Sequence, residues 1–478
     1  NTNKCGNFDS MFQGCSVLKE LDMSNWKVRG NAAGANASIT NMFAGMEYIT
    51  IIHIGPGMVL QGTGFTEIAA IGPDMSGYWY KDGTRKADRY GNTAELANTH
   101  YGAASCDTTG IHTYRWIYGG EFASNGNAWW RYDHETQTMS MGLYNYAASA
   151  NHIVTEYGNS LPWLSASGSK SMPITEVKHI VTNFGATGDD GVVCNGGNGL
   201  RPRDLSSWFA GFTSVEDFDG RGLWVDRTGF FTSTFSGDAK LKKIDISTWN
   251  LVSSQRYNVK NITSLGKGIC PTMTDFLAGA TSISQIVAGN QIYLMGSNIA
   301  RTDGLWATGE FTYDNEYTAA DTLWFDTTAH LFTDTTCRYM NSTSTAAATG
   351  RGLGTVTWTF VPGTGAPFDD NPEATWIMAD EDVELSSTTT LHKNTLYVGV
   401  RPTAANKTTA GFEMWAPWAS CDFEEVRTFG GLKPLNMKYW FTNNFLTTEQ
   451  TKTWGFSKYV ASDTYYSPSA DGTYMRVT

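Results

Sequence analysis

Two nine-residue stretches of the chain share one order of apolar and polar positions. Residues 18–26 read LKELDMSNW, and residues 241–249 read LKKIDISTW. Their apolar side chains are three, then two, then three residues apart, which fits a short parallel strand entered from a turn. We therefore expect these side chains to point into the interior of two related segments. They are Leu18, Leu21, Met23 and Trp26 in the first stretch, and Leu241, Ile244, Ile246 and Trp249 in the second.

Each stretch follows a turn in which a bulky apolar residue precedes a glycine by two positions. The element occurs at Phe12 and Gly14, Phe43 and Gly45, Phe209 and Gly211, Phe235 and Gly237, and Leu277 and Gly279. Glycine tolerates the positive φ that such a turn requires. Phe12 and Phe43 are 31 residues apart and Phe209 and Phe235 are 26 apart, a period typical of a solenoid of stacked coils. The alternative is a set of ordinary strands bounded by glycine turns.

The stretch from Met11 to Trp26, MFQGCSVLKELDMSNW, resembles the BspA-like leucine-rich repeat of bacterial surface proteins. The resemblance extends over about residues 1–57 and 204–300. It implies a leucine-rich-repeat-like solenoid, a secreted or wall-attached location, and a role in adhesion or surface structure. The family carries no catalytic residues to transfer. This chain departs from the family pattern because it has few coils in any one block and large modules between the blocks.

A longer duplication surrounds the coils. Pro162-Trp163, residues 174–177 and Phe184-Gly185 are echoed in the same order by Pro417-Trp418, residues 423–426 and Phe429-Gly430. Trp-rich alternating stretches at 129–133, 357–360 and 375–378 predict strands of two β-rich modules. Gly-aromatic stretches at 76–79 and 303–306 predict segments that cap the last coil of each block.

These patterns together predict a mainly β fold with little helix, in which solenoid coils alternate with sandwich-like β modules. The expected domains are coils plus a cap (1–116), a β-rich module (117–203), coils plus a cap (204–340), a β-rich module (341–435), and the first coil of an incomplete solenoid (436–478).

The last block stops after its first coil, near Trp440, and the N-terminus resumes where that block leaves off. Cys5 precedes Gly14 by nine residues, as Cys270 precedes Gly279. We expect complementary coil edges at the two ends, which would stack head to tail and extend into a filament. Two alternatives remain open: the chain is a piece of a longer repeat protein, or it follows a removed leader. The opening Asn-Thr-Asn, in place of Met and an apolar signal core, indicates a mature product or an excised piece.

Composition narrows the function classes. Only 17% of residues are charged and 50 are glycine, which is typical of secreted β-rich proteins whose surfaces are polar through hydroxyls and amides. The formal net charge is −12, so no basic patch is available to bind nucleic acid, and we expect no nucleic-acid partner. Since no run of about 18 apolar residues occurs, we also expect no transmembrane segment.

Motifs for catalysis and metal binding are missing from the sequence. The eight histidines occur singly, and His134-Glu135 lacks the second histidine of a zinc-protease helix. Neither a nucleophile elbow nor a phosphate-binding loop is present. Acidic pairs such as Asp217 and Asp219 are interpreted as solvated turns, because none has the spacing of a calcium loop. We therefore expect no enzymatic activity, no cofactor and no metal site.

Two sets of residues are candidates for contact with carbohydrate. Tryptophan rings can stack on sugars, although they more often fill cores. The candidates for stacking are Trp129, Trp130, Trp163 and Trp418. The candidates for glycosylation, which depends on the source, are the Asn-x-Ser/Thr positions Asn36, Asn261, Asn341 and Asn406.

The leading hypothesis is a non-enzymatic extracellular protein of the cell surface, with an adhesive or structural role. Its expected partners are further copies of itself, joined head to tail, or a surface protein or glycan. One alternative is a secreted carbohydrate-binding or carbohydrate-active protein. The other is a structural component of an appendage or virion.

Overall fold

A computed structural model of the 478-residue chain provides the structure, and it divides into two compact units, Asn1–Pro202 (unit 1) and Arg203–Thr478 (unit 2). The described residues are 2–28, 37–46, 49–65, 77–83, 88–91, 93–101, 110–147, 152–164, 172–226, 228–249, 273–288, 301, 304–308, 324–327, 356–368, 371–387, 389–400, 418, 421, 423–429, 466–468 and 475–477.

Both units are built mainly from strands, which confirms the predicted mainly β fold with little helix. The strands of unit 1 are β1 (Glu20–Met23), β2 (Ile51–Ile54), β3 (Gly77–Lys81), β4 (Arg89–Gly91), β5 (His112–Phe122), β6 (Asn125–Asp133), β7 (Thr138–Leu143), β8 (Ile153–Val154), β9 (His179–Val181) and β10 (Arg201–Pro202). Its helical pieces are α1 (Thr93–Glu95), a π-helical turn (Leu96–His100) and two short 3₁₀ turns (Gly158–Ser160 and Ile174–Glu176). Within the described residues, no helix has the length and apolar character needed to cross a membrane.

Unit 2 also consists mainly of short strands. They are β11 (Asp217–Asp219), β12 (Lys243–Ile246), β13 (Gln285–Ala288), β14 (Leu305–Thr308), β15 (Trp324–Thr327), β16 (Val356–Val361), β17 (Gly363–Phe368), β18 (Asn371–Ala379), β19 (Val383–Ser386), β20 (Thr389–Leu391), β21 (Thr395–Val400), β22 (Glu425–Phe429), β23 (Tyr466–Pro468) and β24 (Met475–Val477). The predicted module 341–435 is described in part, and β23 and β24 are what the structure describes of residues 436–478.

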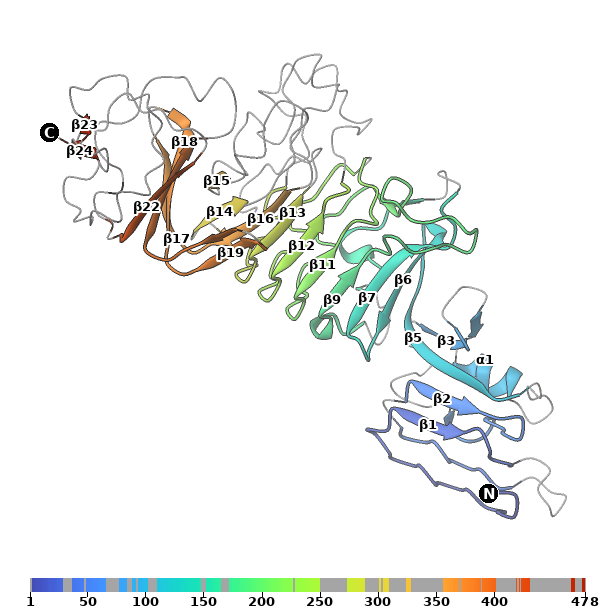
Figure 1. Cartoon of the computed structure of the whole chain (residues 1–478). Coiled ribbons are helices and arrows are strands. Elements are labelled where there is room, and N and C mark those ends of the chain that lie inside the picture. The colour runs from blue at the N-terminus through green and yellow to red at the C-terminus, as the bar shows by residue number, and fades with distance from the viewer. Residues whose placement is uncertain are drawn as a thin grey trace. The chain divides into compact units, whose positions relative to one another are not determined.

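Parallel strands that each follow a similar turn are the common element of the two units. In unit 2, β11, β12 and β13 lie side by side and pair in parallel (Figure 1). In unit 1, β1 and β2 pair in the same way, with Leu21 opposite Ile52. We call a turn together with its strand a turn–strand segment. The five described segments are, in chain order, residues 10–23, 41–54, 207–219, 233–246 and 275–288.

The backbone takes the same path through all five turns. Each turn starts on a non-glycine residue with a φ between 54° and 58° and reaches, four residues later, a glycine with a φ between 74° and 86°. The pairs are Ser10 and Gly14, Asn41 and Gly45, Ser207 and Gly211, Ser233 and Gly237, and Asp275 and Gly279. Short polar residues and glycine tolerate this left-handed region best. The sequence pattern identified the glycine of each turn but not its first residue.

Backbone hydrogen bonds join each turn to the next. The N–H groups of Ser10, Phe12 and Gly14 donate at 2.9–3.0 Å to alternate carbonyls that begin one residue before the second segment and continue into its turn. In unit 2, the third segment donates to the fourth, and the fourth to the fifth, at alternate residues in the same way. The donor always belongs to the earlier segment and the acceptor to the later one. This turn ladder therefore has a direction, and together with the strand pairing it joins neighbouring segments on two sides.

Aromatic rings stack behind the turn ladder. The ring centroids of Phe209 and Phe235 are 5.3 Å apart, and those of Phe12 and Phe43 are 6.0 Å apart. In the fourth segment and the three residues after it, all predicted interior positions are buried, namely Phe235, Leu241, Ile244, Ile246 and Trp249, and Phe209 and Phe43 are buried as well. In the first segment Met23 is buried, whereas Phe12, Leu18, Leu21 and Trp26 are only partly buried.

An antiparallel strand covers the last segment of each unit. β5 pairs with β2 through its first half, and β16 pairs with β13. The predicted boundary at 116/117 falls inside β5, because this one strand runs on from β2 to pair with β6. The division between the two units, at Pro202 and Arg203, lies one residue from the predicted boundary at 203/204.

A glycine-to-ring contact recurs beside each covering strand. β3 pairs with β5, and β14 pairs with β16. A Cβ on Gly77 would lie 2.6 Å from the Trp116 ring, and one on Gly304 would lie 2.5 Å from the Phe360 ring. Both positions therefore exclude any side chain. These are the Gly-aromatic stretches that the sequence pattern predicts as caps.

We expect Gly237→Ala to destabilise unit 2, because an L side chain at a φ of 86° costs about 1–2 kcal/mol. Urea unfolding followed by circular dichroism measures the change. Gly237→Asn should lose less, since Asn tolerates this conformation. Ser236→Ala, in the same turn but without a positive φ, is the matched control and should leave the midpoint unchanged. Equal losses for Gly237→Ala and Ser236→Ala would contradict the assignment.

Candidate functional site

A recurring aspartate closes the strand in three segments. The Oδ1 atoms of Asp22, Asp219 and Asp245 accept the backbone N–H of the residue two positions later, at 2.9, 3.1 and 3.1 Å. A side-chain acceptor in this position takes the N–H that would otherwise extend the ladder. The aspartate in the repeated sequence pattern is therefore a strand stop. Hydrogen bonds from Ser24 accordingly hold the pKa of Asp22 below its ordinary value.

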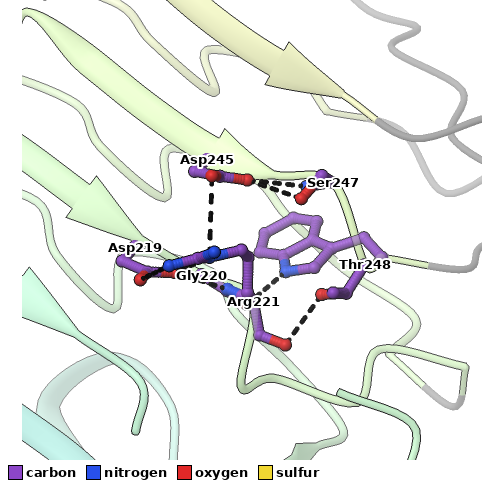
Figure 2. Close-up of polar contacts among 7 residues, drawn as sticks. Asp219, Gly220, Arg221, Asp245, Ser247 and Thr248 are labelled. Carbon is purple, nitrogen blue, oxygen red and sulfur yellow. Dashed lines mark hydrogen bonds and ion pairs between the residues drawn. The ribbon is translucent and has the colours of Figure 1, made fainter. Parts of the chain in front are cut away.

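Arg221 joins two of these aspartates, as Figure 2 shows. Its Nε and terminal nitrogen donate to the two carboxylate oxygens of Asp219 at 2.9 and 2.6 Å. The same Nε lies 3.6 Å from Oδ2 of Asp245 on the neighbouring strand. The hydrogen bond to Asp219 and the two negative charges raise the pKa of Arg221. We call this group of three residues the Arg221 clasp.

The residues after Asp245 extend the clasp to the preceding segment. The Ser247 hydroxyl donates to Asp245 at 2.7 Å, and the Thr248 hydroxyl donates to the backbone carbonyl of Arg221 at 2.7 Å. The indole N–H of Trp249 donates to the carbonyl of Gly220 at 2.8 Å. These contacts give each polar member of the Asp-x-Ser-Thr-Trp stretch a defined partner. The hydrophobic pattern predicts Trp249 as a core residue but does not predict its hydrogen bond to the carbonyl of Gly220.

The clasp binds neighbouring segments and does not resemble a catalytic site. Each of its carboxylates faces the same guanidinium. Asp219, expected to be a solvated turn residue, is ion-paired instead, because Arg221 follows it by two positions and folds back on it. Among the described residues, no group of three His, Cys, Asp or Glu side chains is placed to hold a metal ion.

A second polar cluster, in unit 1, also connects strands. Arg89 of β4 contacts Glu121 of β5 at 2.6 Å, and the Tyr144 hydroxyl donates to the same carboxylate at 3.3 Å. The guanidinium of Arg131 lies 4.4 Å from the ring centroid of Trp129. Burial raises the pKa of Tyr144, which keeps its hydroxyl protonated and able to donate. Here too the charges are paired within the protein.

The candidate stacking residues are buried. Trp129, Trp130, Trp163 and Trp418 are all at most 7% exposed. Trp130 packs against Trp163 at 6.0 Å and 66°, and Trp376 packs against Trp418 at 6.1 Å and 67°. A ring must expose a face to stack on a sugar, so these rings fill the interiors of their modules instead. The candidate glycosylation residues Asn36, Asn261, Asn341 and Asn406 lie outside the described residues.

Asp238 is a buried carboxyl at a position where other segments have apolar side chains. Its residue is fully buried, and neither carboxylate oxygen has a hydrogen-bond partner. The corresponding positions hold Met46, Phe212 and Ala280. Burial raises the pKa of Asp238 to about 8, and the nearby backbone N–H groups of Phe212 and Gly211 offset only part of that effect.

Comparisons of the chain with protein-family models, with curated proteins and with solved structures find no match. The resemblance to BspA-like repeats therefore remains a prediction from the sequence. The role assigned to the polar groups therefore rests on their contacts, which connect neighbouring turn–strand segments.

Replacing Arg221 with Gln should lower the free energy of unfolding by roughly 0.5–1 kcal/mol, since two partly exposed carboxylates then face each other without a cation. Arg221→Lys should lose about half as much, because it keeps the charge but not the two parallel hydrogen bonds. Urea midpoints at low and high salt measure both effects. Lys242→Gln removes the more exposed pair with Glu216 and serves as the control, with a smaller loss. A larger loss for Lys242→Gln than for Arg221→Gln would contradict the role of the clasp.

The Asp238 carboxyl should make stability depend on pH. Its folded-state pKa of about 8 exceeds the ordinary 3.8, so the folded state binds the proton more tightly. Stability from this group is therefore complete below about pH 4 and falls as pH rises, by about 1.4 kcal/mol per unit, until about pH 8. Unfolding midpoints between pH 5 and 9 should fall more steeply for the wild type than for Asp238→Asn. Exposed Asp380→Asn is the control, and a wild-type slope equal to that of Asp238→Asn would refute the assignment.

Proposed function

We propose that this chain is a non-enzymatic extracellular protein with an adhesive or structural role at a surface. In this proposal the turn–strand segments are coils of a leucine-rich-repeat-like solenoid, similar to the BspA-like repeats. The β strands between the blocks of coils form modules that cover the last coil of each block. Its partners are further copies of itself or a surface protein or glycan.

The observation that carries the proposal is the use of charged groups as connectors. Arg221 pairs with Asp219 and with Asp245 on the neighbouring strand, and Glu216 and Lys242, which precede the same two strands, pair at 2.8 Å. Catalysis needs an acid, base or nucleophile whose pKa is tuned and which a substrate can reach. Asp238, whose pKa is raised to about 8 by burial, has no exposed surface for a substrate.

Composition supports the location. A chain with 17% charged residues and 50 glycines keeps its surface polar through hydroxyl and amide groups. The turns use these residue types directly, because Ser, Asn, Asp and Gly occupy the left-handed positions. A stack of similar coils also offers a long surface, which suits contact with an extended polymer or with a second molecule.

The proposal is tested by assaying the purified 478-residue chain against a panel of polysaccharides for both binding and hydrolysis. We expect retention on surface glycan or on cell-wall material and no product release. The reason is that the polar clusters of the described residues are already paired with one another between strands. Reducing-sugar release and pull-down on the insoluble polymers measure the two activities. Bovine serum albumin at the same concentration gives the background for retention.

Turnover that disappears on a single Asp or Glu substitution would overturn the proposal in favour of a secreted carbohydrate-active enzyme. Location is tested separately by trypsin treatment of intact source cells. Peptides of this chain should be released under conditions that leave a cytosolic marker protein intact. Peptides that appear only after lysis would contradict a surface location.

A further inference from the structure

We infer that the first turn–strand segment, residues 10–23, is an open docking edge for a turn–strand segment of a second copy of this chain. The inference rests on the stacking part of the proposed function and is independent of the proposed location. Its evidence is a set of unused hydrogen-bonding groups and uncovered apolar side chains whose counterparts in the second, fourth and fifth segments are engaged.

Three backbone carbonyls mark the edge. Where one turn follows another, the acceptors are Thr40, Met42 and Ala44, then Thr232, Thr234 and Ser236, then Thr274, Phe276 and Ala278. The counterparts in the first segment are the carbonyls of Asp9, Met11 and Gln13. These three residues are exposed, and within the described residues their carbonyls accept no hydrogen bond. The first turn therefore has the acceptor side of a turn ladder without a donor.

Among the described residues, strand β1 and Trp26 also have hydrogen-bonding groups without partners on the side away from the second segment. Within the described residues β1 pairs only with β2, so its other edge is open. The indole N–H of Trp249 bonds to the carbonyl of the preceding segment, whereas that of Trp26 has no hydrogen-bond partner among the described residues. Open strand edges of this kind commonly take an added strand from another chain.

Apolar surface is exposed at the same edge. Met11 is 53% exposed, whereas its counterparts Met42, Thr234 and Phe276, which all follow an earlier segment, are 0% exposed. Phe12, Leu21 and Trp26 are likewise only partly buried. By contrast, Val17 is 83% exposed, and its counterpart in the stacked fourth segment, Lys240, is exposed as well. Docking should therefore cover Met11 and leave Val17 in solvent.

The direction of the ladder and the sequence select the occupant. The edge offers acceptors, so the partner must offer alternate N–H groups from a turn of the same kind. Residues 440–454, which lie outside the described residues, begin with Trp440-Phe441, the counterpart of Trp208-Phe209. They continue with Leu446 and Trp454, which are eight residues apart, as Leu18 and Trp26 are. We assign this stretch of a second copy as the occupant.

Such a contact joins two different surfaces, so each added copy leaves the same edge open. On its other side the second segment is covered by antiparallel β5. Among the described segments of unit 1, the first therefore offers the open edge, and association should produce a series of oligomers instead of a closed dimer.

Sedimentation velocity of the full chain at 1–100 μM, a range chosen to span weak association, tests the inference. The wild type should sediment as a series that grows with concentration. Met11→Glu should remain monomeric, because the new charge is solvated in the monomer but would be buried on docking. Val17→Glu carries the same change at the control position and should associate like the wild type. Circular dichroism and urea midpoints should be equal for all three, since both substituted side chains are exposed.

A complementary pair of variants identifies the occupant. Trp440→Glu alters the proposed donor segment and keeps the first segment intact, so alone it should be monomeric. Mixed with Met11→Glu, it should form a dimer and no larger species, because each variant supplies the edge that the other lacks. A wild type that is monomeric at every concentration, or Met11→Glu that associates normally, would overturn the inference. Either result would leave the proposed surface role to be judged by its own assays.

Discussion

The arrangement of both units depends on the hydrogen bonds that run from each turn to the next. Where one turn stacks on another, alternate backbone N–H groups of the earlier turn donate to carbonyls of the later turn. The pairing requires the same backbone path in every segment, with a left-handed residue at each end of the turn. The need for Gly, Ser, Asn and Asp at these ends follows from that path. The ladder therefore accounts for the glycine and the short polar residue at the ends of each of the five turns.

Once the turns are in register, the side chains behind them must match as well. Phe209 and Phe235 stack because their backbones are held at equivalent places, and Trp249 reaches the carbonyl of Gly220 for the same reason. Arg221 occupies the position that Ser247 has in the next segment, and it bonds to two carboxylates instead of one. Asp238 is the exception, since its carboxyl replaces an apolar side chain without gaining a partner.

Local patterning predicts the parts of this fold that short-range physics determines. The spacing from Leu241 to Trp249 gives the buried positions of the fourth segment, and the glycine that ends each turn is visible as a repeated letter. The left-handed residue that begins each turn could not be predicted, because it is Ser in some turns and Asn or Asp in others. The Arg221 clasp could not be predicted either, because the sequence around Arg221 lacks the Asp-x-Ser-Thr-Trp pattern. The extent of β5 cannot be read locally either, since its partners β2, β3 and β6 come from separate parts of the chain.

Strand direction explains why a block of segments ends where it does. A parallel strand brings with it a turn that can donate to the next turn, whereas an antiparallel strand arrives from the opposite side and brings no such turn. β5 and β16 therefore complete the strand pairing of β2 and β13, although the Phe43 N–H of the second segment still donates to the carbonyl of Thr63 at 2.8 Å. The close contact of Gly77 with Trp116, and of Gly304 with Phe360, holds a further strand against each covering strand and leaves no room for a side chain. The first segment of unit 1 has no comparable terminator within the described residues, and the polarity of the ladder makes it an acceptor surface for a segment of the same kind.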